Sequence, residues 1–299
     1  MTTRPTSHAR DGSADIGLAG HRARLLAGVP VTERRVEAAG IPTTVLEGGD
    51  GPPLVLLHGP GESAVNWRWV LPDLVRTHRV VAPDLPAHGS SGTGTGRLDV
   101  DGVTAWLGDL VRGTCPEAPA VVGHVLGGAI AARFAARHGD RLRALVLVDS
   151  LGLAPFRPSA RFAARFLGFQ ARPNERTFER FMGQCAFDLD DLRAGMGGDW
   201  TSFVAYNLGL ARGDGAKEAG RLFRRVGLST IPAQVLDGID VPTALIWGRH
   251  DRALRLRIAE RARARHGWPL YVIDDAADDP PRDRPEAFLR ALHTALDGS

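Results

Sequence analysis

Short apolar runs alternate with amphipathic stretches along most of the chain. The runs consist mainly of Val, Leu, Ile and Ala and lie at residues 54–57, 80–82, 120–122, 145–148, 244–247 and 270–273. Continuous apolar runs of this length are typical of strands that are buried on both faces of a parallel sheet. Between them, residues such as Ile130 and Phe134 recur at helical spacing. Strands that alternate with helices predict an α/β fold with a mostly parallel sheet flanked by helices.

Three segments depart from this alternation and outline the organisation of the chain. Residues 1–20 are polar and aperiodic, which is typical of a flexible tail. Residues 34–48 contain two strand-like segments joined at Gly40, which predict an antiparallel pair. From about residue 151 to residue 235 the strand pattern stops, and Arg-rich helical segments with many aromatic residues replace it. We therefore expect a tail, a core made of residues 21–150 and 236–299, and a helical insertion at 151–235.

Composition and charge narrow the classes of partner. The chain has 299 residues, of which 43% are apolar, so it can bury the core of a globular domain. Its formal charge of +3 comes from 37 basic and 34 acidic residues, a balance that predicts no nucleic-acid partner. Cys115 and Cys185 lie far apart with no Cys/His cluster, so we expect no disulfide, no metal and no cofactor. No apolar run has the length of a membrane span, which predicts a cytoplasmic protein without a membrane partner.

Residues 120–132 predict a strand, a very tight turn and a helix in direct succession. Gly123, Gly127 and Gly128 bracket the turn, where side chains would collide. This pattern resembles the nucleophile elbow Gly-x-Ser-x-Gly of the α/β-hydrolase superfamily. Here Val125 stands in the position of the nucleophile, and a hydrocarbon side chain cannot attack a carbonyl carbon. We also expect backbone strain of about 1–3 kcal/mol at Val125, because a β-branched residue is poorly suited to positive φ.

Other motifs carry the same resemblance in the same order along the chain. They are His58-Gly59, residues 84–91, residues 248–251 and residues 285–288. The resemblance implies that Gly59, Pro60 and Leu126 form the oxyanion region. Pro60 has no backbone N–H to donate, so the oxyanion hole is expected to be impaired. Asp84 and His88 are implied to hold a turn together rather than to act in catalysis.

The resemblance also places the remaining members of the catalytic triad. Asp251 matches the acid, and Asp149, directly after the apolar run 145–148, is a reserve acid. Counting back from the last helix puts Asp278 where the family has its histidine. The family inserts a helical lid where this chain has residues 151–235. We therefore expect a lid above an apolar pocket that takes a small apolar or amphipathic organic molecule.

Three functions are compatible with a site of this composition. The first is a non-hydrolytic acid/base catalyst, in which Asp251 and Asp278 carry out proton transfer, elimination or cyclisation. The second is a ligand-binding pseudoenzyme that kept the pocket and lost the chemistry. The third is a hydrolase with a carboxylate-activated water or a non-standard nucleophile such as Cys185. We place the acid/base catalyst first.

Asp251 and Asp278 are expected to lie at the ends of adjacent strands. Two like charges in a poorly solvated site cannot both ionise easily, so such a pair should hold one proton above the ordinary pKa range of Asp. In the alternative arrangement, Asp278 accepts hydrogen bonds from loop amides or pairs with Arg249 or Arg282.

The sequence predicts no measurable hydrolysis of activated aryl esters, because neither the nucleophile nor the base of the triad has its expected residue type. Val125→Ser alone should restore little activity, since the new hydroxyl would lack a base. The Val125→Ser/Asp278→His double variant is the informative comparison in a spectrophotometric esterase assay. Wild-type turnover that disappears when a pocket residue is replaced would contradict the prediction.

Overall fold

One mixed sheet forms the centre of the protein. A computed structural model describes residues 16–94 and 96–298, and within them eight strands form this sheet. In spatial order the strands are β1 (Thr32–Ala38), β2 (Ile41–Gly48), β4 (Arg79–Pro83), β3 (Pro53–Leu57), β5 (Ala120–His124), β6 (Ala144–Val148), β7 (Thr243–Gly248) and β8 (Leu270–Ile273). The β1–β2 and β2–β4 pairs are antiparallel, and the remaining pairs are parallel. The predicted α/β fold with a mostly parallel sheet is confirmed.

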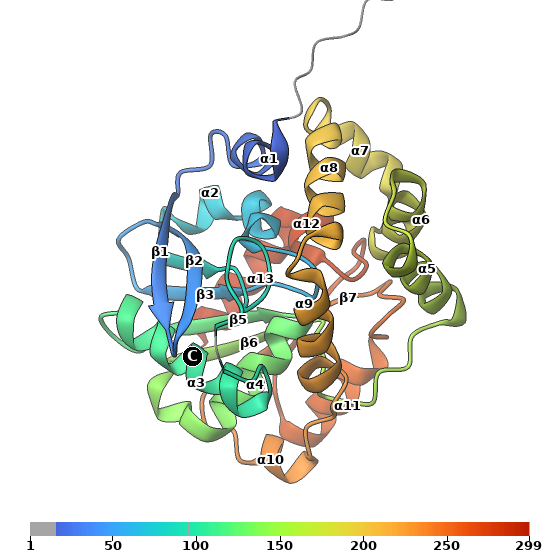
Figure 1. The fold of residues 1–299 in the computed structure, drawn as a ribbon. Helices are drawn as coiled ribbons and strands as arrows, with labels where there is room; N and C mark the ends of the chain where they lie inside the picture. The colour runs from blue at the N-terminus through green and yellow to red at the C-terminus, as the bar shows by residue number, and fades with distance from the viewer. Residues whose placement is uncertain (1–15, 95, 299) are drawn as a thin grey trace, which may run out of the picture.

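Helices cover both faces of the sheet (Figure 1). One face packs against α3 (Val100–Thr114), α4 (Leu126–His138) and α11 (Arg257–His266). The other face packs against the short helices η1 (Ala64–Trp69) and α2 (Leu71–Leu74) and against α13 (Pro285–Asp297). Because successive side chains of a strand point to opposite faces, Val121 belongs to the first core and Val122 to the second. This double burial explains why the central strands are continuous apolar runs.

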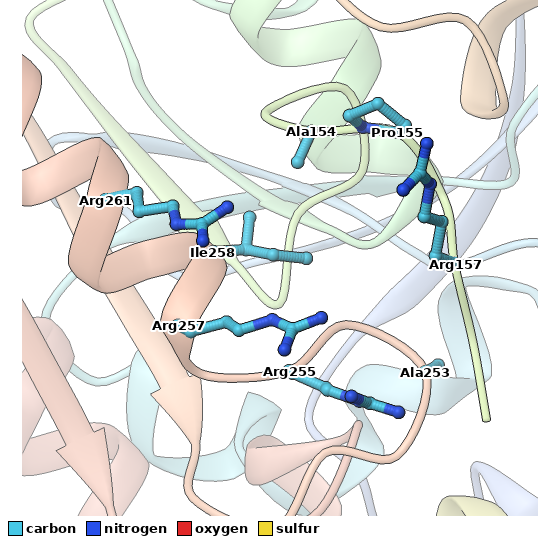
Figure 2. Close-up of a pocket in the computed structure, with 8 residues that line it drawn as sticks. All are labelled: Ala154, Pro155, Arg157, Ala253, Arg255, Arg257, Ile258 and Arg261. Atoms are coloured by element: carbon cyan, nitrogen blue, oxygen red, sulfur yellow. The ribbon is translucent and has the colours of Figure 1, made fainter.

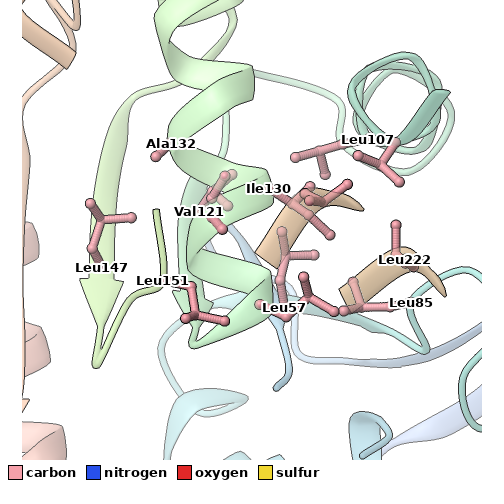
Figure 3. Close-up of a cluster of buried hydrophobic side chains, with 14 of the residues drawn as sticks. Leu57, Leu85, Leu107, Val121, Ile130, Ala132, Leu147, Leu151 and Leu222 are labelled. Atoms are coloured by element: carbon pink, nitrogen blue, oxygen red, sulfur yellow. The ribbon is translucent and has the colours of Figure 1, made fainter. Parts of the chain in front are cut away.

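The first core closes around α4, the helix that follows the tight turn. Figure 3 shows Ile130 on α4 among Leu57, Leu107 and Val121, which come from β3, α3 and β5. All four side chains are fully buried. Burial of such side chains contributes roughly 1.5–3 kcal/mol each, so this cluster fixes the position of α4 against the sheet.

A helical segment lies between β6 and β7, in the part of the chain where the lid is expected. It contains α5 (Ala160–Ala171), α6 (Glu175–Cys185), α7 (Leu189–Met196), α8 (Asp199–Arg212), α9 (Ala216–Leu222), the π-helical turn η3 (Phe223–Gly227) and α10 (Ala233–Asp237). Capping side chains define where these helices begin. Ser159 Oγ accepts a hydrogen bond from Phe162 N at the start of α5, and Asn174 forms a capping box with Thr177 at the start of α6.

The aromatic residues of the inserted segment mainly contact one another. Phe169 stacks on Phe181 with ring centroids 5.7 Å apart, and Phe178 lies 5.6 Å from Phe169. Phe162 also contacts Phe181, at 5.6 Å. These rings give the α5–α6 pair a small core of its own, as expected for most of the aromatic residues. Whether the segment acts as a lid stays a prediction.

The N-terminal part of the chain differs from the expected tail. Residues 1–15 lie outside the described residues, but residues 17–20 form the first turn of α1 (Gly17–Leu25) rather than continuing a tail. The reason is a buried contact with the core. Arg22 Nη1 lies 3.1 Å from Oδ2 of Asp84 and donates to Tyr206 Oη at 2.8 Å. Asp84 in turn accepts hydrogen bonds from the backbone N–H of Ala64 at 2.7 Å and of Ser90 at 2.8 Å.

Replacing Arg22 with Met should destabilise the fold by about 3 kcal/mol or more, because the carboxylate of Asp84 would remain buried without its cation. The Arg22→Met/Asp84→Asn double variant should recover part of this loss. Arg24 lies on the same helix in an exposed ion pair with Asp199, so Arg24→Met is the matched control and should cost less than about 1 kcal/mol. Urea unfolding measures all three variants, and equal losses for Arg22→Met and Arg24→Met would contradict the interpretation.

Candidate active site

The tight turn between β5 and α4 has the backbone strain that the sequence predicts. Val125 adopts φ 46° and ψ −100°. Hydrogen bonds on both sides hold it there: its N–H donates to Val148 O at 3.0 Å, and its carbonyl accepts from Leu151 N at 3.1 Å. A Cβ atom added to Gly127 would lie 2.3 Å from Leu57 O, so this glycine is required for the close approach of α4. The half-buried side chain of Val125 therefore lies at the carboxyl end of the central strand.

The two candidate acids, Asp149 and Asp251, are neighbours at the ends of β6 and β7. Asp149 Oδ1 accepts a hydrogen bond from Gly248 N at 3.1 Å. Asp251 Oδ1 accepts from Ala253 N at 2.6 Å and from Leu254 N at 2.7 Å. Within the described residues, Asp251 Oδ2 is buried without a hydrogen-bond partner. Thus the reserve acid is a direct neighbour of the expected acid, and one oxygen of Asp251 is unsatisfied.

Burial is the largest influence on both carboxyl groups, and it raises the pKa of Asp149 well above the usual range for Asp. The charge of Asp251 raises the pKa of Asp149 further. Burial also raises the pKa of Asp251, although the amides of Leu254 and Ala253 and the contact with Asp149 offset part of that effect. The contact between the two carboxyl groups therefore favours a shared proton that resides mainly on Asp149.

Asp278 lies in the loop between β8 and α12 (Pro280–Asp283), and its side chain is 17% exposed. Its Oδ1 atom is 3.6 Å from Nη2 of Arg282, which is one of the alternatives expected from the sequence. The other, Arg249, pairs instead with Asp274 at 2.6 Å. Arg282 is itself shared, because its Nη1 lies 2.9 Å from Asp279 Oδ2.

Despite the nearby guanidinium, the pKa of Asp278 is raised well above its ordinary value. Burial is the largest cause, and the charges of Asp251 and Asp279 add to it, while Arg282 acts in the opposite direction. Asp278 and Asp251 thus interact as like charges, as the sequence suggested, but within a cluster that also contains Asp149 and Arg282. The expected two-carboxylate pair is part of a larger network.

His124 and Glu62 form a second charged pair next to the turn, and the sequence analysis missed it. His124 Nε2 donates to the backbone carbonyl of Asp278 at 2.6 Å, and its Nδ1 lies 3.6 Å from Oε2 of Glu62. Burial alone would lower the pKa of His124. Interaction with Glu62, the charge of Asp279 and the carbonyl of Asp278 outweigh burial and raise this pKa to about 9. His124 is therefore a cation at neutral pH.

Glu62 also occupies part of the expected oxyanion region. Its Oε2 atom accepts a hydrogen bond from Gly59 N at 2.8 Å. Burial would raise the pKa of Glu62, but His124 reverses that effect, so Glu62 is an anion. Pro60 contributes no N–H, and the amide of Gly59 is already used by a carboxylate. Three residues were expected to form the oxyanion region. Among them, Leu126 is the only one whose backbone N–H donates no hydrogen bond within the described residues.

A cavity of about 210 Å³ lies next to Arg282. It lies between the inserted segment and the core, and its lining includes Trp69, Asp191, Leu192, Arg282 and Asp283. Arg282 connects this lining to Asp278 and Asp279, but Val125, Asp149, Asp251 and Asp278 do not themselves line the cavity. Its mixed lining is less apolar than the pocket expected from the sequence.

Cys185, the alternative nucleophile, ends α6 and is buried beside Asp278. Burial and the charge of Asp278 raise the pKa of its thiol well above the usual range. A protonated thiol is a poor nucleophile, so this position does not favour cysteine chemistry.

The described residues contain no group of three or more His, Cys, Asp and Glu side chains that could hold a metal ion. Among the same residues, no helix is both long enough and apolar enough to cross a bilayer.

The sequence matches the family model for the alpha/beta hydrolase fold over residues 52–280. The chain therefore belongs to the α/β-hydrolase family. It is 38% identical over 133 residues to a 2-hydroxymuconate semialdehyde hydrolase from Pseudomonas sp. (strain CF600), a match that covers 42% of this chain and 46% of the relative. It is 33% identical over 155 residues to the pimeloyl-[acyl-carrier protein] methyl ester esterase of Aeromonas hydrophila, covering 48% of this chain and 58% of that protein.

These two matches are partial: the chain spans about half the length of each of these curated relatives. Among solved structures, the carboxylesterase CesB from Bacillus subtilis superposes with a TM-score of 0.79 and 20% identity, covering 94% of this chain and 98% of that chain. At this identity the similarity shows the fold alone. The relatives are named as hydrolases, so their names indicate a broad class of chemistry and not the reaction of this chain.

The pKa of His124 predicts how stability changes with pH. Its folded-state pKa of about 9 exceeds the ordinary histidine value of 6.5, so its contribution is complete below pH 6.5 and is lost as pH rises through 9. We expect the free energy of unfolding to fall over this interval by up to about 3 kcal/mol. His124→Asn should flatten the decline in denaturant unfolding, whereas His250→Asn, at an exposed histidine, should retain it. An unchanged decline in His124→Asn would contradict the assignment.

Proposed function

We propose that this protein is a non-hydrolytic acid/base catalyst acting on a small organic molecule under the helical segment. The observation that carries the proposal is the burial of Asp149 and Asp251 at the ends of the neighbouring strands β6 and β7, where their carboxyl groups interact. Buried carboxyl groups that share a proton supply an acid and a base at the same place. The reaction class that needs only these groups is proton transfer at a carbon made acidic by a neighbouring carbonyl, with elimination or cyclisation as its extensions.

The residues around the turn argue against the acyl-enzyme route that a serine hydrolase uses. Val125 cannot act as a nucleophile, and Asp278 stands where the histidine is expected. In addition, the carboxylate of Glu62 accepts from Gly59 N, so it would repel an oxyanion that developed there. Loss of a nucleophile or base alone lowers turnover by a factor on the order of 10⁶ in a serine protease. The degenerate triad is therefore part of this proposal.

His124 supports the proposal as a positioning residue. Its positive charge lies between Glu62 and the loop that carries Asp278, so it balances part of the surplus negative charge. Without it, more carboxyl groups would have to be protonated for the region to stay folded. We expect the balance of protons among the acids to depend on His124.

Hydrolysis by an activated water is the second candidate, and the names of the relatives favour it. In that case a deprotonated carboxylate would activate water instead of exchanging a proton with the substrate. A ligand-binding role without chemistry remains the third possibility and predicts binding with no turnover.

One experiment distinguishes these candidates. Native mass spectrometry of protein purified from its own host identifies the bound molecule. That molecule and related carbonyl compounds are then incubated with the protein in D₂O and, separately, in H₂¹⁸O. An acid/base catalyst should incorporate deuterium at carbon, which NMR detects, whereas a hydrolase should incorporate ¹⁸O into a cleaved product. A binder should do neither.

Asp251→Asn should lower the rate of deuterium incorporation by about 10²-fold or more, because it removes one member of the proton-sharing pair. Asp240→Asn is the matched control, since Asp240 is exposed and lies outside the site, and it should retain the wild-type rate. Circular dichroism verifies that both variants are folded. Full exchange in folded Asp251→Asn, or ¹⁸O incorporation that depends on Asp251, would overturn the proposal.

A further inference from the structure

A second cavity, separate from the carboxyl cluster, is lined by four arginines. It has a volume of about 200 Å³ and lies between the loop after β6 and the start of α11. Its lining consists of Ala154, Pro155, Arg157, Ala253, Arg255, Arg257, Ile258 and Arg261. Figure 2 shows Arg257 and Arg261 extending from α11 toward the loop that carries Ala154, Pro155 and Arg157. Of the residues that the structure describes, no acidic one lines the cavity.

These four guanidinium groups lack the partners that nearby arginines have. Arg249 pairs with Asp274 at 2.6 Å, and Arg265 pairs with Asp237 at 2.7 Å. By contrast, within the described part of the chain, the guanidinium groups that line this cavity have no hydrogen bond and no ion pair. The four arginines are exposed, and their positive charge is not paired within the described residues.

The position of one of these arginines is also unfavourable for the helix that carries it. Arg257 is the first residue of α11, although the same first turn contains Glu260, and Arg261 lies one turn later. The N-terminus of a helix carries partial positive charge, so acidic residues are stabilising there and basic residues are not. A residue type that destabilises its own helix is expected at positions that serve a function. An anion in the cavity would reverse the cost, because it would interact with both the helix N-terminus and the guanidinium groups.

We infer that this cavity binds a phosphoryl group, either as a free phosphate or diphosphate or as part of a larger organic molecule. The planar guanidinium fork matches phosphate oxygens and can bind two of them at once. The volume is below the roughly 300–1,000 Å³ of pockets that enclose a drug-sized ligand, so it suits a compact charged group. The apolar side chains of Ala154, Pro155 and Ile258 border the charged space and would contact the remainder of an organic ligand.

The site would be connected through the backbone to the turn that carries Asp251. Ala253 lines the cavity, and its N–H donates to Asp251 Oδ1 at 2.6 Å. The residue before α5 also contacts this turn, because Ser159 N donates a hydrogen bond to Arg252 O at 3.3 Å. The phosphoryl site does not depend on the proposed acid/base reaction, and binding can be measured without any substrate.

Isothermal titration calorimetry with pyrophosphate tests the inference on the full-length protein. Wild-type protein should bind pyrophosphate, and Arg255→Gln/Arg257→Gln should weaken the affinity by about tenfold or more, since it removes two guanidinium groups from the lining. Arg263→Gln, also exposed on α11 but outside the lining, is the matched control and should change the affinity by less than about twofold. Absence of binding to wild type, or an equal loss in both variants, would overturn the inference.

Parallel titrations distinguish the possible ligands. A nucleoside diphosphate that binds more tightly than pyrophosphate and loses affinity in the double variant would support an organic phosphoryl ligand. Pyrophosphate bound more tightly than the nucleotide, again with a loss in the double variant, would support a free inorganic anion. Malonate, a dicarboxylate, is the chemical control. Malonate binding as tight as that of pyrophosphate would overturn the assignment to phosphoryl chemistry.

Discussion

The tight turn from β5 into α4 is the constraint on which the active region depends. A Cβ atom at Gly123 would lie 2.6 Å from the backbone of Gly127, and one at Gly128 would lie 2.3 Å from Ser150 Oγ. Only glycine at these positions allows α4 to begin directly against the sheet. The same geometry imposes positive φ on Val125, at a cost of about 1–3 kcal/mol that the surrounding hydrogen bonds and buried core offset. The turn thus persists with a side chain that cannot use it for nucleophilic attack.

An excess of acidic over basic side chains governs the chemistry beside this turn. The carboxyl groups of Glu62, Asp278, Asp279 and Asp283 lie beside one of two cations, His124 or Arg282, and those of Asp149 and Asp251 interact with each other next to this cluster. A buried charge without a counter-ion is costly, so the region has to retain protons that isolated carboxyl groups would release near pH ~4. Burial, together with the negative charge of Asp251, raises the pKa values of Asp149 and Asp278. Buried acids in this state hold protons that a substrate could receive.

The fold could be predicted from the sequence because its signals are local and repeat in order. Buried strands correspond to continuous apolar runs in the sequence, and the glycines of the turn are close together in the chain. The site could be predicted only where motifs mark it, as at Val125, Asp251 and Asp278. His124 and Glu62 were missed because each lies in a segment that the sequence analysis assigned to the turn or to the oxyanion region. Their pairing depends on a three-dimensional contact between β5 and the loop after β3. The contact of Arg22 with Asp84 was missed for the same reason, since 62 residues separate them.

The parallel sheet explains how one family can contain different chemistries in one place. Strands β3, β5, β6, β7 and β8 all run in the same direction, so the residues that follow them meet at one edge. Which atoms meet there depends on single side chains at the strand ends, whereas the fold depends on the apolar runs and glycines behind them. A valine at the turn and an aspartate after β8 therefore leave the architecture intact while they change which side chains meet at this edge. For this reason the fold similarity to a carboxylesterase at 20% identity and the absence of a hydroxyl at Val125 are compatible.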